Sequence, residues 1–554
     1  RGLAWIYPNG YSCMVTMQSW MFLSSFETLR RKILTMRTIK NLLHMENMVM
    51  GIAFGTAVAN LYGSHIEDYK GQFNYMTMKD IDGDKPFAFP TAHKRNCSAN
   101  IENFKKIPGS PVAYWVSENV LKGFESGKAL QDIGQPRQGL ATADNNRFLR
   151  LWYEVQSSRI GYGYDSLEAA KDSGLKWFPY NKGGEFRKWY GNNDFIVNWE
   201  NDGNEIRNFG DDSGYIRSRA QNTQYYFKPA VSWSKISAGD IAFRYKPEGH
   251  IFDVAGTSVF ADIKVLHYLQ GFCNSIVALS YAKVLSPTLN YEVGHIANFP
   301  ILTTNEDEVI ELTKKNITLS ATDSDSFETS WDFVRHPILQ WQQFIATYHP
   351  GEYNHTIEES YQALFAHTIR QFAELKHNEE ELNRIFIEIY GLQDELIPEV
   401  EDRNVTVHKI FDTKDDIPKA MRGSRYALTK EDVVKSLISY AVGCIFGRYS
   451  LDIEGLAYAG GEWDNTKYKS FIPDEDNCLP ITDEEYFGDD IVGRFVEFIR
   501  TVYGTETLEE NLDFIAAALG NKGNTSRDVI RNYFLNDFFK NHCQIYQKRP
   551  IYWM

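Results

Sequence analysis

The stretch that decides our interpretation of the chain begins Gly139-Leu140-Ala141-Thr142-Ala143-Asp144-Asn145-Asn146-Arg147-Phe148-Leu149-Arg150 and ends Trp177-Phe178-Pro179-Tyr180-Asn181-Lys182-Gly183-Gly184-Glu185-Phe186-Arg187-Lys188-Trp189-Tyr190. Its first part is typical of a loop entering a helix, which Thr142 or Asp144 can cap. Arg147 and Arg150 would share one helix face, opposite Phe148, Leu151 and Trp152. A helix start with spare backbone N–H groups, two asparagines and two arginines can receive a phosphate or a base edge. The stretch therefore predicts a DNA-reading element.

The second part of the stretch is a glycine turn flanked by basic and aromatic side chains. Lys182, Arg187 and Lys188 carry the charge, and glycines such as Gly183 let backbone N–H groups approach phosphates. Two plainer interpretations stay open: a capped surface helix with ordinary salt bridges for the first part, and a charged hairpin turn for the second. Four tryptophans fit core positions better than base-stacking platforms, namely Trp177, Trp189, Trp199 and Trp233.

Further basic residues fall in predicted strands. A strand over residues 215–219 would place Arg217 and Arg219 on one face, because side chains alternate along a strand. Strands are also predicted over residues 231–236 and 241–245, the second of which carries Arg244. The predicted DNA-binding residues are Thr142, Asn145, Asn146, Arg147, Arg150, Tyr180, Asn181, Lys182, Gly183, Arg187, Lys188, Arg217, Arg219 and Arg244. The sequence does not sort them between base edges and phosphates.

The charge of the chain is divided unevenly. Its 554 residues predict three or four domains, and 43% apolar residues are enough for several cores. Residues 1–302 carry 33 Lys+Arg against 28 Asp+Glu, whereas residues 303–554 carry 25 against 45. The net charge of −15 therefore belongs to the C-terminal half, and the mildly basic N-terminal half is the part expected to face a polyanion.

Cysteine usage and hydropathy favour a cytoplasmic protein. The six cysteines are scattered without a Cys-x-x-Cys pair, which indicates reduced thiols rather than a zinc site or a disulfide framework. No apolar run approaches the roughly 18 residues of a membrane span. We predict no metal: the aspartates around Gly83 resemble a calcium loop but lack the later bidentate glutamate, so a solvated turn is expected.

Hydrophobic periodicity predicts an α/β start and a helical end. A buried strand over Tyr11–Met17, a helix over residues 20–34 and strands over 39–43 and 55–61 suit the second half of a doubly wound domain. A short helix is expected over 112–121. One long helix or a helical pair is expected over 357–390, and further helices over 429–446, 490–503, 508–519 and 525–540.

Several blocks resemble a known family. The segments Pro8-Asn9-Gly10-Tyr11, Gln18-Ser19-Trp20-Met21-Phe22-Leu23, Glu27-Thr28-Leu29-Arg30 and Phe54-Gly55-Thr56-Ala57-Val58 resemble the late motifs of adenine-N6 DNA methyltransferases. The block from Gly139 resembles the target-recognition domains of type II methyltransferases fused to restriction activity. The block 180–190, Ser326-Phe327-Glu328-Thr329-Ser330-Trp331-Asp332-Phe333, Ala441-Val442-Gly443-Cys444-Ile445-Phe446-Gly447-Arg448-Tyr449-Ser450 and Lys548-Arg549-Pro550-Ile551-Tyr552-Trp553 resemble the PglX family of BREX phage-defence methyltransferases.

The resemblance implies a fold class of α/β plus α. Residues 1–134 would hold the C-terminal half of a class I, Rossmann-like methyltransferase fold and a connector, and residues 135–302 a mixed α+β target-recognition domain. Residues 303–425 would form a helical spacer and 426–554 a helical C-terminal domain. The implied partners are double-stranded DNA and other phage-defence proteins, and the implied cofactor is S-adenosylmethionine.

The chain also departs from the family pattern. The catalytic Asn-Pro-Pro-Tyr/Phe tetrapeptide is missing, as is the glycine-rich loop for S-adenosylmethionine, so we expect an internal fragment that is inactive alone and has no catalytic or cofactor-binding residues. A non-catalytic DNA-specificity or assembly subunit and a protein-interaction scaffold stay open as alternatives. No acidic-x-Lys follows the Pro-Asp pair at Pro473, so an endonuclease centre is unsupported.

Overall fold

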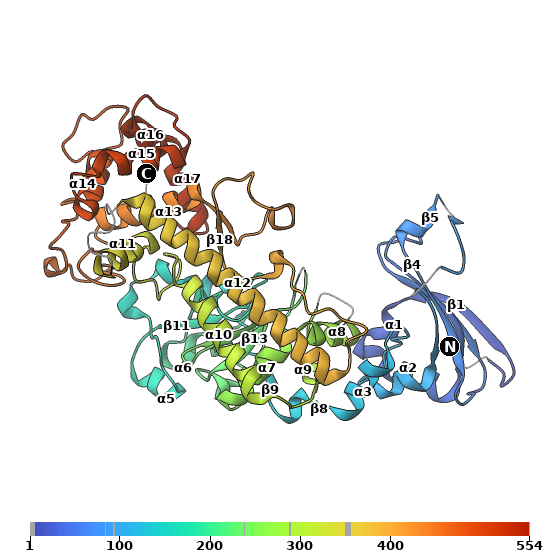
Figure 1. The fold of residues 1–554 in the computed structure, drawn as a ribbon. Helices are drawn as coiled ribbons and strands as arrows, with labels where there is room; N and C mark the ends of the chain where they lie inside the picture. Colours follow the sequence, from blue (N-terminus) through green and yellow to red (C-terminus); the bar gives the residue numbers. More distant parts are fainter. Residues whose placement is uncertain are drawn as a thin grey trace.

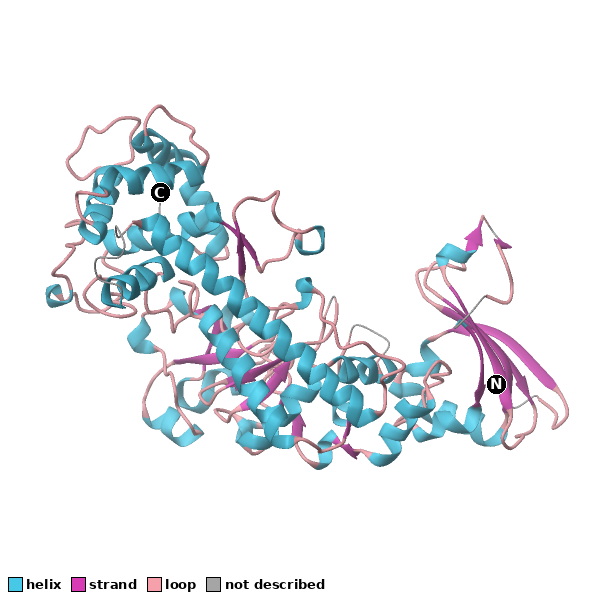
Figure 2. Cartoon of the chain, viewed as in Figure 1, coloured by secondary structure: helices cyan, strands magenta, loops and turns pink. Residues whose placement is uncertain are grey.

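The computed structural model describes residues 6–83, 85–91, 95–237, 239–286, 290–348 and 356–552. Asp84 of the predicted solvated turn and Trp553 of the last quoted block lie outside these residues. The fold is mixed α/β with many helices. Figure 1 shows an elongated molecule with a sheet at the N-terminal end and helices at the C-terminal end. Strands gather at the N-terminal end and in the centre (Figure 2).

The N-terminal sheet has five strands in the order β1-β3-β2-β4-β7. They are β1 (Tyr11–Met17), β3 (Thr56–Tyr62), β2 (Thr38–Met45), β4 (Lys70–Met76) and β7 (Asn96–Asn100). Strand β3 runs antiparallel to both of its neighbours, with Tyr11 opposite Tyr62 and Met17 opposite Thr56, while β2 and β4 are parallel. Strands β1 and β2 therefore run in the same direction, and β3 lies between them.

Two N-terminal predictions need correction. Strand β1 exists but is mostly exposed, with Tyr11 at 62% and Val15 at 59%, because among the described residues it is an edge strand. The predicted helix over 20–34 is broken into α1 (Ser19–Phe22) and α2 (Glu27–Met36), joined by a 3₁₀ turn. The break has a physical cause, since the buried Arg30 guanidinium donates to the carbonyls of Trp20 (3.0 Å), Leu23 (2.6 Å) and Gly109 (2.7 Å).

The central region contains two four-stranded sheets. One has the order β10 (Leu149–Leu151), β12 (Phe195–Asn198), β11 (Trp177–Asn181) and β15 (Ile251–Phe252). The other has the order β14 (Phe243–Lys246), β13 (Ala230–Trp233), β16 (Ser258–Phe260) and β9 (Gln135–Arg137). The four tryptophans predicted as core are at most 9% exposed, which confirms that prediction. The predicted strand over 215–219 is wrong, because Ile216 and Arg219 form only isolated bridges.

The main helices are α3 (Glu118–Ser126), α7 (Ile263–Cys273), α8 (Ile276–Leu285), α10 (Glu306–Ser324), α11 (Pro337–Tyr348), α12 (Ile357–Tyr390), α13 (Lys430–Ile445), α14 (Ile491–Tyr503), α15 (Leu508–Leu519), α16 (Ser526–Tyr533) and α17 (Phe539–Ile545). Helix α3 begins six residues later than the helix predicted over 112–121. A π-helical turn over Phe534–Phe538 separates α16 from α17, where one helix was predicted. Shorter pieces are α4 (Asn145–Phe148), α5 (Leu167–Asp172), α6 (Glu200–Arg207), α9 (Val293–Ala297), β5 (Ile81–Asp82), β6 (Lys85–Pro86), β8 (Lys128–Ala129), β17 (Pro300–Ile301), β18 (Lys409–Phe411) and β19 (Ala427–Thr429).

Local signals set the ends of α12 and α13. Thr356 and Glu359 form a capping box at the start of α12, and Gly391 ends the helix with φ of 65°, a conformation that favours glycine. Thr429 and Asp432 form the same box at the start of α13. Both predicted helices are confirmed within a residue of their bounds. None of the helices in the described part of the chain has the length and apolar character needed to cross a membrane.

Candidate nucleic-acid interface

Two loops that are distant in the sequence lie against each other on the central region. Ala141 and Arg219 exchange both backbone hydrogen bonds, each 2.9 Å long, and so join residues 141–150 to residues 210–219. We call these two segments the loop surface. Five predicted DNA-binding residues are exposed on it, namely Asn145, Asn146, Arg147, Arg217 and Arg219, and Asp212 and Ser213 are exposed there as well. The structure thus brings together two groups of predicted DNA-binding residues.

The helix predicted at this surface is a single turn. Helix α4 spans only Asn145–Phe148, and Asp144 caps it by accepting from the Arg147 amide at 3.1 Å. Thr142 is buried and donates to Asn145 at 2.7 Å, so of the two predicted caps Asp144 is the one used. Arg150 lies on β10 rather than on a helix face, and its Nη1 donates at 2.6 Å to the carbonyls of Asn146 and Leu149.

Weak ion pairs hold the exposed arginines of the loop surface. Arg147 is 52% exposed and pairs with Glu205 at 2.7 Å, and Arg217 is 60% exposed and pairs with Asp211 at 3.3 Å. Exposed pairs of this kind contribute only about 0–1 kcal/mol, so a phosphate can replace the carboxylate at small cost. These arginines are therefore available to a polyanion.

Two exposed apolar residues of the loop surface were missed by the sequence reasoning. Tyr215 is 70% exposed and Ile216 is 43% exposed, directly before Arg217. They follow the turn at Gly214, whose φ is 81°. Minor-groove proteins combine such side chains: they insert apolar residues between base steps and place arginines in the groove beside them. The signal was the turn-forming Asp-Asp-Ser-Gly run before Tyr215, which makes a loop tip more plausible than a strand.

Five other predicted DNA-binding residues lie beneath the surface: Tyr180, Asn181, Gly183, Arg187 and Arg244. Tyr180 donates to Asp253 at 2.6 Å, and Asn181 donates to Ser232 at 2.6 Å. Arg244 donates to the Arg187 carbonyl at 3.1 Å and is 1% exposed. Protein encloses the polar groups of these five residues, so the side chains are not exposed to a duplex. They instead hold the central strands and loops together.

The basic residues of the glycine turn make distant ion pairs. Arg187 pairs with Asp323 of α10 at 3.0 Å, and both side chains are at most 8% exposed. Lys188 pairs with Glu379 of α12 at 2.7 Å, and Trp189 donates to the same carboxylate at 2.6 Å. Lys182 is half-buried near the Phe195 ring, and this burial lowers its pKa although Asp253 opposes the shift. The turn therefore fastens the central strands to the long helices.

A separate aromatic pocket lies at one end of the N-terminal sheet. It encloses about 660 Å³, and its walls include Phe22, Tyr75, Tyr114 and Trp115. His44 bridges Gln18 at 2.6 Å and the Tyr114 hydroxyl at 3.0 Å, and burial lowers the pKa of His44 to about 4. Its imidazole is therefore neutral at physiological pH. No local pattern could have revealed this pocket, because its walls come from six separate segments.

The described residues include no group of three or more His, Cys, Asp or Glu side chains arranged to hold a metal ion. The pair nearest to the predicted solvated turn is Asp80 with Arg95. Hydrogen bonds from Arg95 and Thr77 hold the pKa of Asp80 well below its usual range. In this pair the carboxylate is already neutralised by a guanidinium.

Sequence comparison finds two adenine-specific methyltransferases. The chain is 41% identical over 561 aligned residues to the adenine-specific methyltransferase PglX of Lacticaseibacillus casei (strain Zhang), covering 98% of this chain and 44% of that protein. It is 34% identical over 571 residues to the adenine-specific methyltransferase BrxX of Escherichia coli O9:H4 (strain HS), covering 99% and 44%. The chain thus spans less than half the length of these relatives. No protein-family model matches it.

Structure comparison finds restriction-modification enzymes at low similarity. The type IIL restriction-modification enzyme MmeI in complex with DNA has a TM-score of 0.40 at 12% identity, covering 70% of this chain and 47% of that one. A nuclease-deletion mutant of the type ISP enzyme LlaGI, in complex with a DNA substrate mimic, has a TM-score of 0.30 at 10% identity, covering 57% and 36%. These TM-scores are too low to support an inference about the fold or the partners of this chain.

Proposed function

Since this chain is a homologue of the PglX and BrxX adenine-specific methyltransferases, we propose that it forms the DNA-recognising, C-terminal part of a site-specific adenine-N6 DNA methyltransferase in phage defence. The observation that carries the proposal is the 41% identity that extends over 98% of the chain. For the complete enzyme we further propose double-stranded DNA as the substrate, S-adenosylmethionine as the methyl donor and other defence proteins as partners.

The topology of the N-terminal sheet supports its assignment to a class I methyltransferase fold. Parallel strands β1 and β2 are joined by α1 and α2, which is the strand–helix–strand crossover of doubly wound sheets. Among the described residues β1 is an edge strand, whose backbone groups could pair with further strands of the same sheet, and its exposed side chains Tyr11, Val15 and Met17 offer an apolar face for packing. Residues 1–134 would then be the end of the catalytic fold.

The loop surface supports DNA binding by residues 135–302. Arg147, Arg217 and Arg219 would contact phosphates and fix the register, while Asn145 and Asn146 are long enough to pair with base edges. The buried pairs of Arg187 and Lys188 would hold this surface rigidly on α10 and α12, the beginning of the proposed helical spacer over 303–425. Rigid support matters because recognition depends on side chains held in place before DNA arrives.

The aromatic pocket suits the base that the complete enzyme would act on. An enzyme that modifies a base flips it out of the duplex and holds it between aromatic side chains. Phe22, Tyr75, Tyr114 and Trp115 provide such rings, and His44 holds Gln18, whose side-chain amide nitrogen can donate to a base edge. The Asn-Pro-Pro tetrapeptide and the glycine-rich loop are absent from the chain. We therefore expect no methyl transfer by this chain alone.

DNA binding at several salt concentrations tests the proposal. The triple variant Arg147→Ala, Arg217→Ala, Arg219→Ala should bind a labelled duplex more weakly, and its salt slope should shrink by about 0.9 for each lost phosphate contact. The matched control is Arg384→Ala, Arg403→Ala, Arg527→Ala, which removes three exposed, glutamate-paired arginines from the acidic half. Equal losses in the two triples, or no loss in the first, would contradict the proposed interface.

A further inference from the structure

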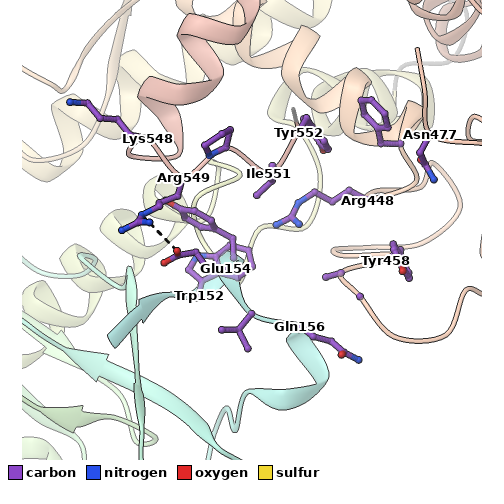
Figure 3. Close-up of a pocket in the computed structure, with 16 residues that line it drawn as sticks. Trp152, Glu154, Gln156, Arg448, Tyr458, Asn477, Lys548, Arg549, Ile551 and Tyr552 are labelled. Atoms are coloured by element: carbon purple, nitrogen blue, oxygen red, sulfur yellow. Dashed lines mark ion pairs between the residues drawn. The ribbon is translucent and has the colours of Figure 1, made fainter. Parts of the chain in front are cut away.

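A second pocket lies between the central region and the C-terminal helices, apart from the loop surface. It encloses about 800 Å³, within the range of small-molecule sites of roughly 300–1,000 Å³. One wall is the segment 152–156, which follows β10, and the others come from Arg448, residues 458–460 and residues 548–552 (Figure 3). We call it the joint pocket, because its walls belong to regions more than 290 residues apart in the chain.

Arg448 is the unusual residue of the joint pocket. Its Nε and Nη2 atoms are buried without a hydrogen-bond partner, and no ion pair to it is found among the described residues. Its guanidinium instead lies 5.7 Å from the ring centres of Trp152 and Tyr449. A buried donor without an acceptor destabilises the fold, and more strongly so when the donor is charged. An anion that accepts two parallel hydrogen bonds would remove that penalty.

No carboxylate compensates Arg448 fully. The hydroxyls of Tyr449, Tyr546 and Tyr552 act on its charge, and the buried Glu328 is influenced by Arg448 without forming an ion pair with it. Burial raises the pKa of Glu328 to about 7, although Ser439, Arg448 and Tyr449 oppose the shift. At neutral pH this carboxyl is thus protonated in a large fraction of molecules. Arg448 keeps an excess positive charge toward the pocket.

Two more cations stand at the rim. Lys548 and Arg549 follow α17 on exposed backbone, and both line the pocket. Arg549 approaches Glu154 only at 3.7 Å, a loose contact with an arginine that is 63% exposed. Three positive side chains against one negative make the pocket cationic, within a half of the chain that carries 45 acidic residues against 25 basic ones. This local reversal of sign marks an anion site rather than an average surface.

Aromatic rings line the same pocket. Trp152 is held in place because its Nε1 donates to the Thr329 carbonyl at 2.8 Å, and Tyr458 packs 5.1 Å from the Trp463 ring centre. Figure 3 shows Trp152, Tyr458 and Tyr552 around the same space as Arg448. Planar rings beside a cationic cluster match a ligand that joins a phosphate to a flat heterocycle.

We propose that the joint pocket binds a free nucleotide, with its phosphates on Arg448, Lys548 and Arg549 and its base against Tyr458. A duplex backbone fits less well, because the unpartnered nitrogens of Arg448 are buried at the inner wall, where a rigid double helix cannot reach. Since the walls come from two regions, the bound nucleotide would strengthen their packing, which is otherwise held by contacts such as the Ser157 amide to the Ala459 carbonyl at 3.3 Å.

Calorimetric titration of the whole chain with ADP, adenosine, inorganic phosphate and a short duplex tests the proposal. We expect ADP to bind and to raise the unfolding temperature, and adenosine to bind at least about tenfold more weakly, because adenosine lacks the phosphates that accept charge-assisted hydrogen bonds. The rim variant Lys548→Ala, Arg549→Ala keeps the buried residues and should weaken ADP binding about tenfold or more. The control Lys414→Ala, Arg403→Ala removes two exposed, glutamate-paired cations that lie outside this pocket, and it should bind ADP like the unaltered chain.

The variant Arg448→Lys keeps a charge but loses the planar fork, so it should bind ADP more weakly while the rim residues stay intact. Absence of ADP binding at millimolar concentration, or equal binding by the rim variant, would overturn the proposal. Binding of the duplex but not of ADP, lost in the same variants, would also overturn it and assign the cations to a DNA backbone. The proposal does not depend on the loop surface, whose variants leave the pocket unchanged.

Discussion

The two parts of the stretch 139–190 are similar in sequence, but the first is exposed in the fold and the second is buried. The first part, around Arg147, is exposed and makes a solvent-exposed ion pair with Glu205 of α6. The second part, around Arg187, is enclosed and pairs with a helix 136 residues later in the chain. A run of basic residues between aromatic ones therefore specifies neither a surface nor an interior. Whether such a run is exposed or buried depends on where its acidic partners lie in the fold.

The largest expected effect is on the enclosed part. Arg187→Ala leaves Asp323 buried without its arginine, which should lower the free energy of unfolding by about 3–5 kcal/mol. Chemical denaturation followed by circular dichroism measures this loss. The control Arg147→Ala, in the exposed part, removes a pair of the same chemistry. If both variants lost a similar free energy of unfolding, the buried pair of Arg187 would be no more important for stability than the exposed pair of Arg147.

Acid should reveal the same buried pair. Burial alone would raise the pKa of Asp323, but His408 and Arg187 more than offset this, and the pKa lies below its ordinary value. A carboxyl with a lowered folded pKa stabilises above its unfolded value of about 3.9 and loses that contribution as pH falls through the folded value. Stability should therefore drop on acidification below about pH 4, and Asp323→Asn should flatten the drop. A pH series of unfolding midpoints that is unchanged by Asp323→Asn would contradict this account.

An intermediate effect is expected at the tip of the loop surface. Tyr215→Ala should weaken DNA binding by about 1–3 kcal/mol if the ring stacks on a base, with little change in salt slope, because no charge is removed. Fluorescence anisotropy with a labelled duplex measures both quantities. Tyr486→Ala, which removes an exposed tyrosine from the acidic half, is the control. Unaltered affinity in Tyr215→Ala would remove this residue from the proposed interface.

The smallest effect is expected on the stability of the exposed part. Arg217→Ala should change the free energy of unfolding by no more than about 0.5 kcal/mol, as surface substitutions usually do. Its effect should appear instead in the salt dependence of DNA binding. A loss of several kcal/mol in thermal or chemical unfolding would show that the loop surface supports the fold. The exposed Arg217 would then contribute to stability much as the buried Arg187 does.

Local signals in the sequence predicted those elements whose ends are set by neighbouring residues. Helices α12 and α13 were predictable because a capping box begins each one, and a glycine with positive φ ends α12. Helix 20–34 was mispredicted because its break depends on Arg30 binding the carbonyl of Gly109, 79 residues away. Periodicity cannot report such a contact.

The candidate sites were predictable only in part for the same reason. The loop at 141–150 was found from its residue types, but Tyr215 and Ile216 were misassigned to a strand. The burial of Arg187 and Arg244 could not be seen, since their partners come from distant strands and helices. Both pockets escaped notice altogether, because each gathers side chains from separate segments that share no spacing.

Helix α12 has a mechanical consequence for the molecule. Its 34 residues make a rod of about 51 Å at 1.5 Å per residue. The end near Ile357 and Tyr361 is embedded in the C-terminal core, while Phe386 and Tyr390 at the other end belong to the central core. Because the intrahelical hydrogen bonds run along the axis and resist a change of length, a movement of one core along this axis would be transmitted to the other. Helix α12 thus connects the two cores, and the glycine turn is attached to it by the ion pair between Lys188 and Glu379.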